Sequence, residues 1–84
     1  MREKMGMRRK RIRYFAVSKP YCQLGIGSYI SYDIVSCDMY NASVVAEVRD
    51  VTTDRELAMR IVENFNRYQL SPDRMENVID DILI

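Results

Sequence analysis

The sequence predicts a two-layer α+β domain, in which a three-stranded antiparallel β-meander packs on a C-terminal αα-hairpin. Two observations carry this prediction. Apolar and polar side chains alternate in segments of residues 11–51, whereas in residues 53–84 apolar side chains recur every three or four positions. Short polar links separate these segments, and a chain of 84 residues is long enough for one such domain.

The first strand is predicted over residues 11–17. Here Ile12, Tyr14 and Ala16 alternate with side chains of the opposite face, and aromatic and β-branched residues are frequent. Pro20 is predicted to lie beyond the end of this strand, because proline cannot donate a hydrogen bond to a β-ladder.

A long second strand is predicted over residues 21–35. Its apolar face is predicted to consist of Leu24, Ile26, Ile30, Tyr32 and Ile34. Gly25 and Gly27 fall on the other face two positions apart, which predicts a bulge, a bend or a close backbone neighbour.

The third strand is predicted over residues 43–51, where small apolar side chains alternate with charged ones. The polar segment 36–42 precedes it, with Asp38 and Asn41 as turn residues. Because this link is short, the second and third strands are expected to pair as an antiparallel hairpin.

Capping signals open both predicted helices. Thr53 and Glu56 have the spacing of a capping box, so each side chain is expected to accept a hydrogen bond from an unpaired backbone N–H. Ser71 is the predicted cap of the second helix, and Pro72 occupies its first position, where no N–H is needed. The apolar stripes expected to face the sheet are Leu57, Ala58, Ile61, Val62 and Phe65, followed by Met75, Val78, Ile79, Ile82 and Leu83.

A net charge of +1 conceals a basic arm and an acidic body. Residues 1–13 carry a net charge of +6 and the remaining residues carry −5. Residues 1–10 have few apolar anchors and are predicted to form a disordered arm, separate from a single α+β domain over residues 11–84.

Charged side chains are the candidate interaction residues. They are Arg8, Arg9, Lys10, Arg11, Arg13, Asp73, Glu76, Asp80 and Asp81. Asp80 and Asp81 lie in the last turn of a predicted helix, where the macrodipole disfavours negative charge. We therefore expect the arm to lie against the acidic helix of its own or a neighbouring chain. The alternative is that the arm binds nucleic acid, with its cations on phosphates and Tyr14 and Phe15 stacked on bases.

The residue types present argue against an enzyme. The chain contains no histidine, and Cys22 and Cys37 are its only cysteines, so imidazole-based catalysis and a four-ligand zinc site are both unsupported. No glycine-rich phosphate loop is present. We predict no catalytic residue, metal, cofactor or small-molecule substrate. The basic N-terminus without an apolar leader or a long apolar span predicts a cytoplasmic protein with reduced thiols and no membrane contact.

Three C-terminal segments carry a family resemblance: residues 50–54 (DVTTD), 66–72 (NRYQLSP) and 78–83 (VIDDIL). They resemble a family of small uncharacterised proteins of clostridia and related Firmicutes. The resemblance covers residues 50–84 and is weaker at residues 24–27. Leu24 and Ile82 stand where that family has a tyrosine and an aromatic residue. The resemblance implies a cytosolic protein of unknown function and transfers no catalytic residue. The sequence therefore predicts a non-catalytic binding or regulatory module that acts through self-association or a protein partner.

Overall fold

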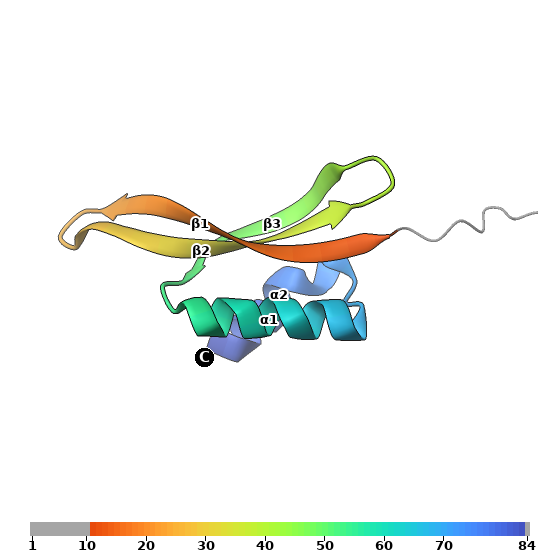
Figure 1. Ribbon diagram of the computed structural model, residues 1–84. Coiled ribbons are helices and arrows are strands. Elements are labelled where there is room, and N and C mark those ends of the chain that lie inside the picture. The colour runs from red at the N-terminus through yellow and green to blue at the C-terminus, as the bar shows by residue number, and fades with distance from the viewer. Residues whose placement is uncertain (1–10, 84) are drawn as a thin grey trace, which may run out of the picture.

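A computed structural model describes residues 11–83 of the chain. Strands β1 (Ile12–Gln23), β2 (Gly27–Asp38) and β3 (Ser43–Thr52) form one antiparallel sheet in the order β1-β2-β3. Helix α1 (Arg55–Tyr68), the 3-10 turn η1 (Pro72–Arg74) and helix α2 (Met75–Leu83) follow. Both helices lie on the same side of the sheet and leave its other face uncovered (Figure 1). The predicted α+β meander on a helical hairpin is confirmed.

The hydrophobic core lies between the sheet and the two helices. Its buried members are Tyr14, Ile34, Val51, Ala58, Ile61, Val62, Phe65, Met75 and Ile79. The rings of Tyr14 and Phe65 meet edge to face, with centroids 5.2 Å apart. The apolar stripe predicted for the first helix is therefore confirmed, because four of its five members are buried against the sheet.

The predicted capping box at Thr53 is wrong by one residue. The N-cap of α1 is Asp54, whose carboxylate accepts from the N–H groups of Glu56 at 3.0 Å and Leu57 at 3.2 Å. Thr52, the last residue of β3, accepts from the Asp54 N–H at 3.0 Å. A carboxylate at this position also interacts favourably with the positive end of the helix dipole.

The second capping prediction has the right position but the wrong mechanism. Ser71 makes no side-chain cap hydrogen bond; its hydroxyl donates to the carboxylate of Asp73 instead. Pro72 opens the turn η1, in which the Arg74 N–H donates to the Ser71 carbonyl at 2.9 Å. The α-helix itself begins only at Met75.

Pro20 does not end the first strand, contrary to the prediction. The N–H and C=O of Tyr14 bond to the side chain of Asn66 on α1, outside the sheet, so they face away from β2. Backbone groups six positions further along a regular strand face the same way, and the register from β1 to β2 is continuous. The nitrogen of Pro20 therefore faces the open edge, where a missing N–H costs no ladder hydrogen bond.

The second strand, predicted over residues 21–35, is wrong: these residues form the end of β1, a hairpin turn and most of β2. β1 pairs with β2 along its whole length, up to Gln23 opposite Gly27. Gly25 and Gly27 have φ values of 86° and 94°, in the left-handed region that glycine adopts without strain. Leu24 and Ile26, assigned to a buried face, lie in the connection and are 100% and 67% exposed.

The third strand is confirmed, with two irregularities. Its register against β2 shifts once near the β2–β3 turn and again near Asp50, which has a φ of 54°. The second shift moves Val51 onto the helix-facing side, where it is buried. In the β2–β3 connection Asp38 acts as a turn residue as predicted, because its carboxylate accepts from the Tyr40 N–H at 3.0 Å.

Candidate interaction surface

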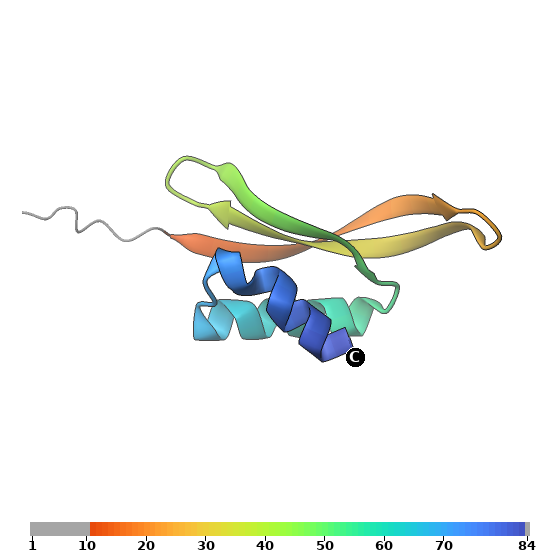
Figure 2. The same ribbon diagram turned by 180° about the vertical axis from the view of Figure 1, so that it is seen from behind.

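The hairpin of β1 and β2 projects beyond the helices as a two-stranded ribbon (Figures 1 and 2). Residues 20–32, which form this ribbon, contain no charged side chain. Leu24, Ile26 and Ile30 are more than half exposed there. An isolated two-stranded ribbon is marginally stable in water, so this one depends on other contacts to keep its shape.

A polar cluster holds the base of the ribbon. It consists of Lys19, Tyr21, Tyr29, Asp33 and Asp50, and we call it the Asp33 cluster. The Asp33 side chain is 0% exposed, and its carboxylate accepts from the Tyr21 hydroxyl at 2.5 Å and the Asp50 N–H at 3.0 Å. The Lys19 ammonium lies 3.2 Å from the second oxygen of the same carboxylate. One buried carboxylate thus joins β1, β2 and β3.

The two tyrosines of the Asp33 cluster extend it toward the tip. Their rings stack with centroids 6.0 Å apart, and the Tyr29 hydroxyl donates to the Asp50 carboxylate at 2.6 Å. The hydrogen bond to Asp33, and secondarily burial, raise the pKa of Tyr21 to about 12. Both hydroxyls therefore remain protonated donors at neutral pH, and the cluster is a structural brace for the ribbon.

Opposing effects act on the charge of Asp33. Burial raises the pKa of this carboxyl, but hydrogen bonds from Tyr21 and the Asp50 amide, together with the nearby lysine, lower it. The net pKa lies below the usual value, so the group is ionised at neutral pH. An ionised carboxylate that accepts two hydrogen bonds and faces an ammonium group is suited to holding strands together.

The helix-free face of the sheet carries a second set of exposed apolar side chains. They are Phe15, Val17, Val44 and Val45. Phe15 pairs with Val35 in the register, and Val35 pairs with Glu47 on β3, so apolar and charged side chains adjoin on this face. Phe15 lies on the edge strand β1 and is 42% exposed, which is high for a phenylalanine.

The predicted charged residues are not brought together in the described part of the chain. Arg8, Arg9 and Lys10 lie outside the described residues. Arg11 and Arg13 are exposed near the start of β1, and the four acidic residues Asp73, Glu76, Asp80 and Asp81 are exposed on η1 and α2. Between residues 11 and 83 no ion pair joins the two groups. The contact of the arm with the acidic helix stays a prediction.

Of the four acidic residues, Asp73 is the one that influences a buried group. Burial, and secondarily the negative charge of Asp73, raise the pKa of Tyr14 to about 12. The Tyr14 hydroxyl donates to the carbonyl of Leu70, which ties β1 to the link between the helices. Asp73 therefore lies close to the core without pairing with a cation within the described range.

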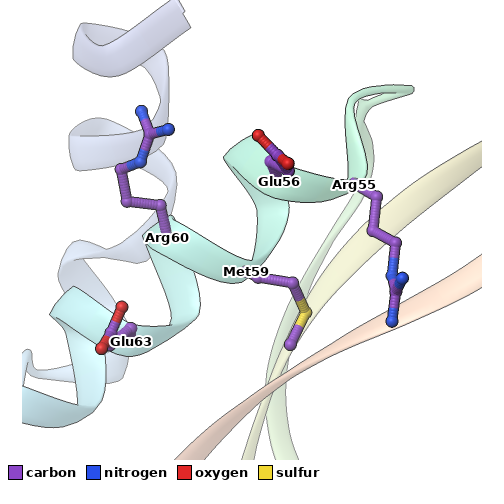
Figure 3. Close-up of a pocket in the computed structure, with 5 residues that line it drawn as sticks. All are labelled: Arg55, Glu56, Met59, Arg60 and Glu63. Carbon is purple, nitrogen blue, oxygen red and sulfur yellow. The ribbon is translucent and has the colours of Figure 1, made fainter.

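A shallow depression of about 340 Å³ lies on α1 and offers little enclosure. Its lining residues are Arg55, Glu56, Met59, Arg60 and Glu63, all of them exposed. Figure 3 shows Arg55 and Met59 leaving the helix on one side and Arg60 on the other. Because one helix supplies the whole lining, this is a feature of an exposed helix surface.

Other candidate sites are also missing from the described residues. In residues 11–83, no three His, Cys, Asp or Glu side chains are arranged to hold a metal ion. Cys22 and Cys37 are unpaired in this range and lie in different rows of the hairpin, opposite Ser28 and Arg13. None of the described helices has the length and apolar character required to span a bilayer.

The chain matches no protein-family profile, no curated protein sequence and no solved structure. The resemblance of residues 50–84 to the clostridial family therefore stays a prediction. Two features of the surface described above were missed from sequence: the ribbon and the Asp33 cluster. The charge-free segment 20–32 with its closely spaced glycines was the signal for the ribbon. No comparable signal marked Asp33, because its partners come from the two other strands.

Proposed function

We propose that this protein is a small non-catalytic binding module that acts through self-association or a protein partner. The supporting observation is that several exposed apolar side chains lie on the strands and in the β1–β2 connection, on surfaces that the helices leave uncovered. These side chains are Phe15, Val17, Leu24, Ile26, Ile30, Val44 and Val45. Single exposed apolar residues are ordinary, but several on one layer are typical of interaction surfaces.

The Asp33 cluster supports a role for the ribbon in binding. Its hydrogen bonds and ion pair fix the base of a projecting element that has no helix beneath its tip. A surface that is already ordered loses less conformational entropy when it binds. The Asp33 cluster therefore favours association by an element that would otherwise be mobile.

A non-catalytic role is favoured by the chemistry of the chain. Histidine is absent from the sequence, and the buried carboxylate of Asp33 is engaged by a tyrosine, a backbone amide and a lysine. A general base has to be accessible to its substrate, and this carboxylate is 0% exposed. The buried ionisable group is thus accounted for by structural contacts.

Capture from a native lysate, with and without nuclease, tests the proposal. The full chain is immobilised beside two variants, Phe15→Glu on the helix-free face and Met59→Glu on α1. The two positions are similarly exposed, at 42% and 49%, so loss of fold affects neither preferentially. We expect Phe15→Glu to reduce nuclease-resistant capture about tenfold and Met59→Glu to leave it unchanged. Equal capture by all three chains, together with a monomeric mass in light scattering, would contradict the proposal.

A nucleic-acid-binding accessory role is the second candidate. It is favoured by the alternation of β1, which places Arg13 and Phe15 on the same helix-free face, both exposed. A cation beside an exposed ring suits a phosphate and a stacked base. Filter binding of single-stranded DNA and RNA from low to moderate salt tests it, and we expect retention that falls steeply with salt. No retention at the lowest salt would rule out this candidate.

A further inference from the structure

The core of this protein is open at one end. Along the helix-facing side of β2, exposure rises from 0% at Ile34 through the half-buried Tyr32 to 56% at Ile30. Along the apolar stripe of α2, exposure rises from 1% at Met75 and Ile79 to 44% at Ile82 and 45% at Leu83. The apolar side chains of β2 continue beyond the part of the sheet that the helices cover. Those of α2 likewise continue beyond the part of the helix that the sheet covers.

Both gradients run toward the same end of the molecule. Figures 1 and 2 show α2 running toward the end from which the β1–β2 ribbon projects, with the C-terminus below the strands on that side. Neither described helix therefore lies beneath the helix-facing side of the ribbon, which includes Pro20 opposite Ile30. The last turn of α2 lies further from the sheet than its first turn does, and Ile82 and Leu83 there are 44% and 45% exposed. The ribbon offers an apolar sheet surface and the end of α2 offers an apolar helix surface, so the two surfaces are complementary.

We propose that a second copy of this chain closes the open end, with the ribbon of each copy lying over the last turn of α2 of the other. This inference rests on the proposed function, because it names the partner of a binding module. If a two-fold axis relates the two copies, the ribbon of each copy covers α2 of the other, so both surfaces are buried in one interface. The packing is sheet on helix, as in the core of each chain, so the two cores become continuous.

The charge distribution favours a copy of the same chain. Residues 20–32 contain no charged side chain, so the ribbon can cover Ile82 and Leu83 without burying an unpaired charge. Asp80 and Asp81 are exposed on the remaining surface of α2 and can stay in water at the rim. The interface gains apolar burial from Ile30, Ile82, Leu83 and the tip of the ribbon.

Sedimentation velocity and light scattering of the full chain, from about 10 μM to about 1 mM, test the proposal directly. We expect the mass of a dimer at the upper concentrations. Ile30→Lys is expected to raise the dissociation constant at least about tenfold, because it places an ammonium group in the apolar contact. Met59→Lys is the control, since Met59 is 49% exposed and lies on α1, outside both the ribbon and α2. It is expected to leave the dissociation constant unchanged.

A second variant guards against a folding defect. Leu83→Glu changes the other side of the contact, at the end of α2. Each variant alone is expected to be monomeric with an unchanged circular dichroism spectrum. An equimolar mixture of Ile30→Lys and Leu83→Glu is expected to form a heterodimer, because the lysine of one chain then meets the glutamate of the other.

Two results would overturn the inference. One is a wild-type chain that stays monomeric over the whole concentration range. The other is a dimer that Met59→Lys dissociates as strongly as Ile30→Lys does. A monomeric chain that still shows Phe15-dependent capture of another protein would leave the proposed function intact while the second copy is ruled out.

Discussion

Ile34 and Ile30 lie on the same face of the same strand, yet one is 0% exposed and the other 56%. Around Ile34 the sheet rests on two helices and is held by apolar burial. Around Ile30 neither described helix lies beneath the sheet, and the side-chain contacts that support this part are the polar bonds of the Asp33 cluster. One sheet is thus stabilised by two different means along its length. The difference shows that backbone pairing can continue two strands beyond the part of the sheet that the hydrophobic core covers.

The largest loss of stability is expected from substitutions in the part of the molecule where the helices cover the sheet. Phe65→Ala removes a ring that is 4% exposed and contacts Tyr14, and should cost about 3–5 kcal/mol of the free energy of unfolding. Tyr68→Ala, on the same helix but 74% exposed, should cost less than about 0.5 kcal/mol. Urea unfolding of both variants measures the difference. Similar losses would mean that α1 does not pack as described.

Asp33→Ala tests the polar half of the comparison. It leaves the Tyr21 hydroxyl and the Asp50 N–H without their acceptor, which should cost about 2 kcal/mol. Amide hydrogen exchange is expected to accelerate first in residues 20–32, because the Asp33 cluster is the brace for that ribbon. Tyr21→Phe removes one of the two bonds and should have about half the effect. Unchanged exchange in the ribbon would show that the cluster is not its support.

Asn66→Ala should cost about 1–2 kcal/mol, because its side chain both accepts from the Tyr14 N–H and donates to the Tyr14 C=O. These bonds occupy the outer edge of β1 much as a neighbouring strand would. Asn64→Ala, on the exposed side of the same helix, is the control and should be nearly neutral. Equal melting temperatures for the two variants would argue against the contact between α1 and the strand edge.

Acid is expected to weaken the ribbon. The pKa of Asp33 is lowered by folding from its ordinary value of 3.8, so its contribution to stability is complete above about that pH. The contribution is lost as the pH falls through the lower pKa of the folded state. Melting temperatures measured from pH 6 to pH 2 should fall less steeply for Asp33→Asn than for the wild-type chain. Parallel curves would mean that Asp33 is not ionised in the fold.

The smallest effect is expected at the tip of the ribbon. Leu24 is 100% exposed, so Leu24→Ser should change the free energy of unfolding of the monomer by less than about 0.5 kcal/mol. A leucine in the core would cost several times more. Chemical unfolding at low micromolar concentration isolates this intramolecular effect. A larger loss would show that the tip has contacts within its own chain.

The fold class was predictable because local patterns agreed with it. The stripe of Ala58, Ile61 and Phe65 and the alternation of residues 43–51 each report on which side faces the core, and that information is local. The error at Pro20 arose because a proline is excluded from a strand only where its nitrogen faces a partner. Which edge is free depends on strand order, and strand order is a property of the whole sheet.

The candidate interaction surface was less accessible to sequence reasoning. The alternation of apolar and polar residues assigned Leu24, Ile26 and Ile30 to the apolar face of a strand, yet all three are exposed. Alternation distinguishes the two faces of a strand, but it does not indicate how far the helices extend over one of them. Asp33 lies on a strand between Tyr32 and Ile34 and gave no sign of burial. Its partners are Lys19, Tyr21 and the amide of Asp50, and only the register and the shift near Asp50 bring them together.

The sequence by itself determined the number of elements, their order and the helix faces that are buried, since capping, periodicity and turn composition act over a few residues. Only the tertiary structure decided where the first hairpin turns, that an aspartate is buried among three strands, and that the core is open beneath the ribbon. These depend on the relative lengths of sheet and helices. Burial and pairing join residues that are distant in the chain, and no local pattern records how far one layer extends beyond the other.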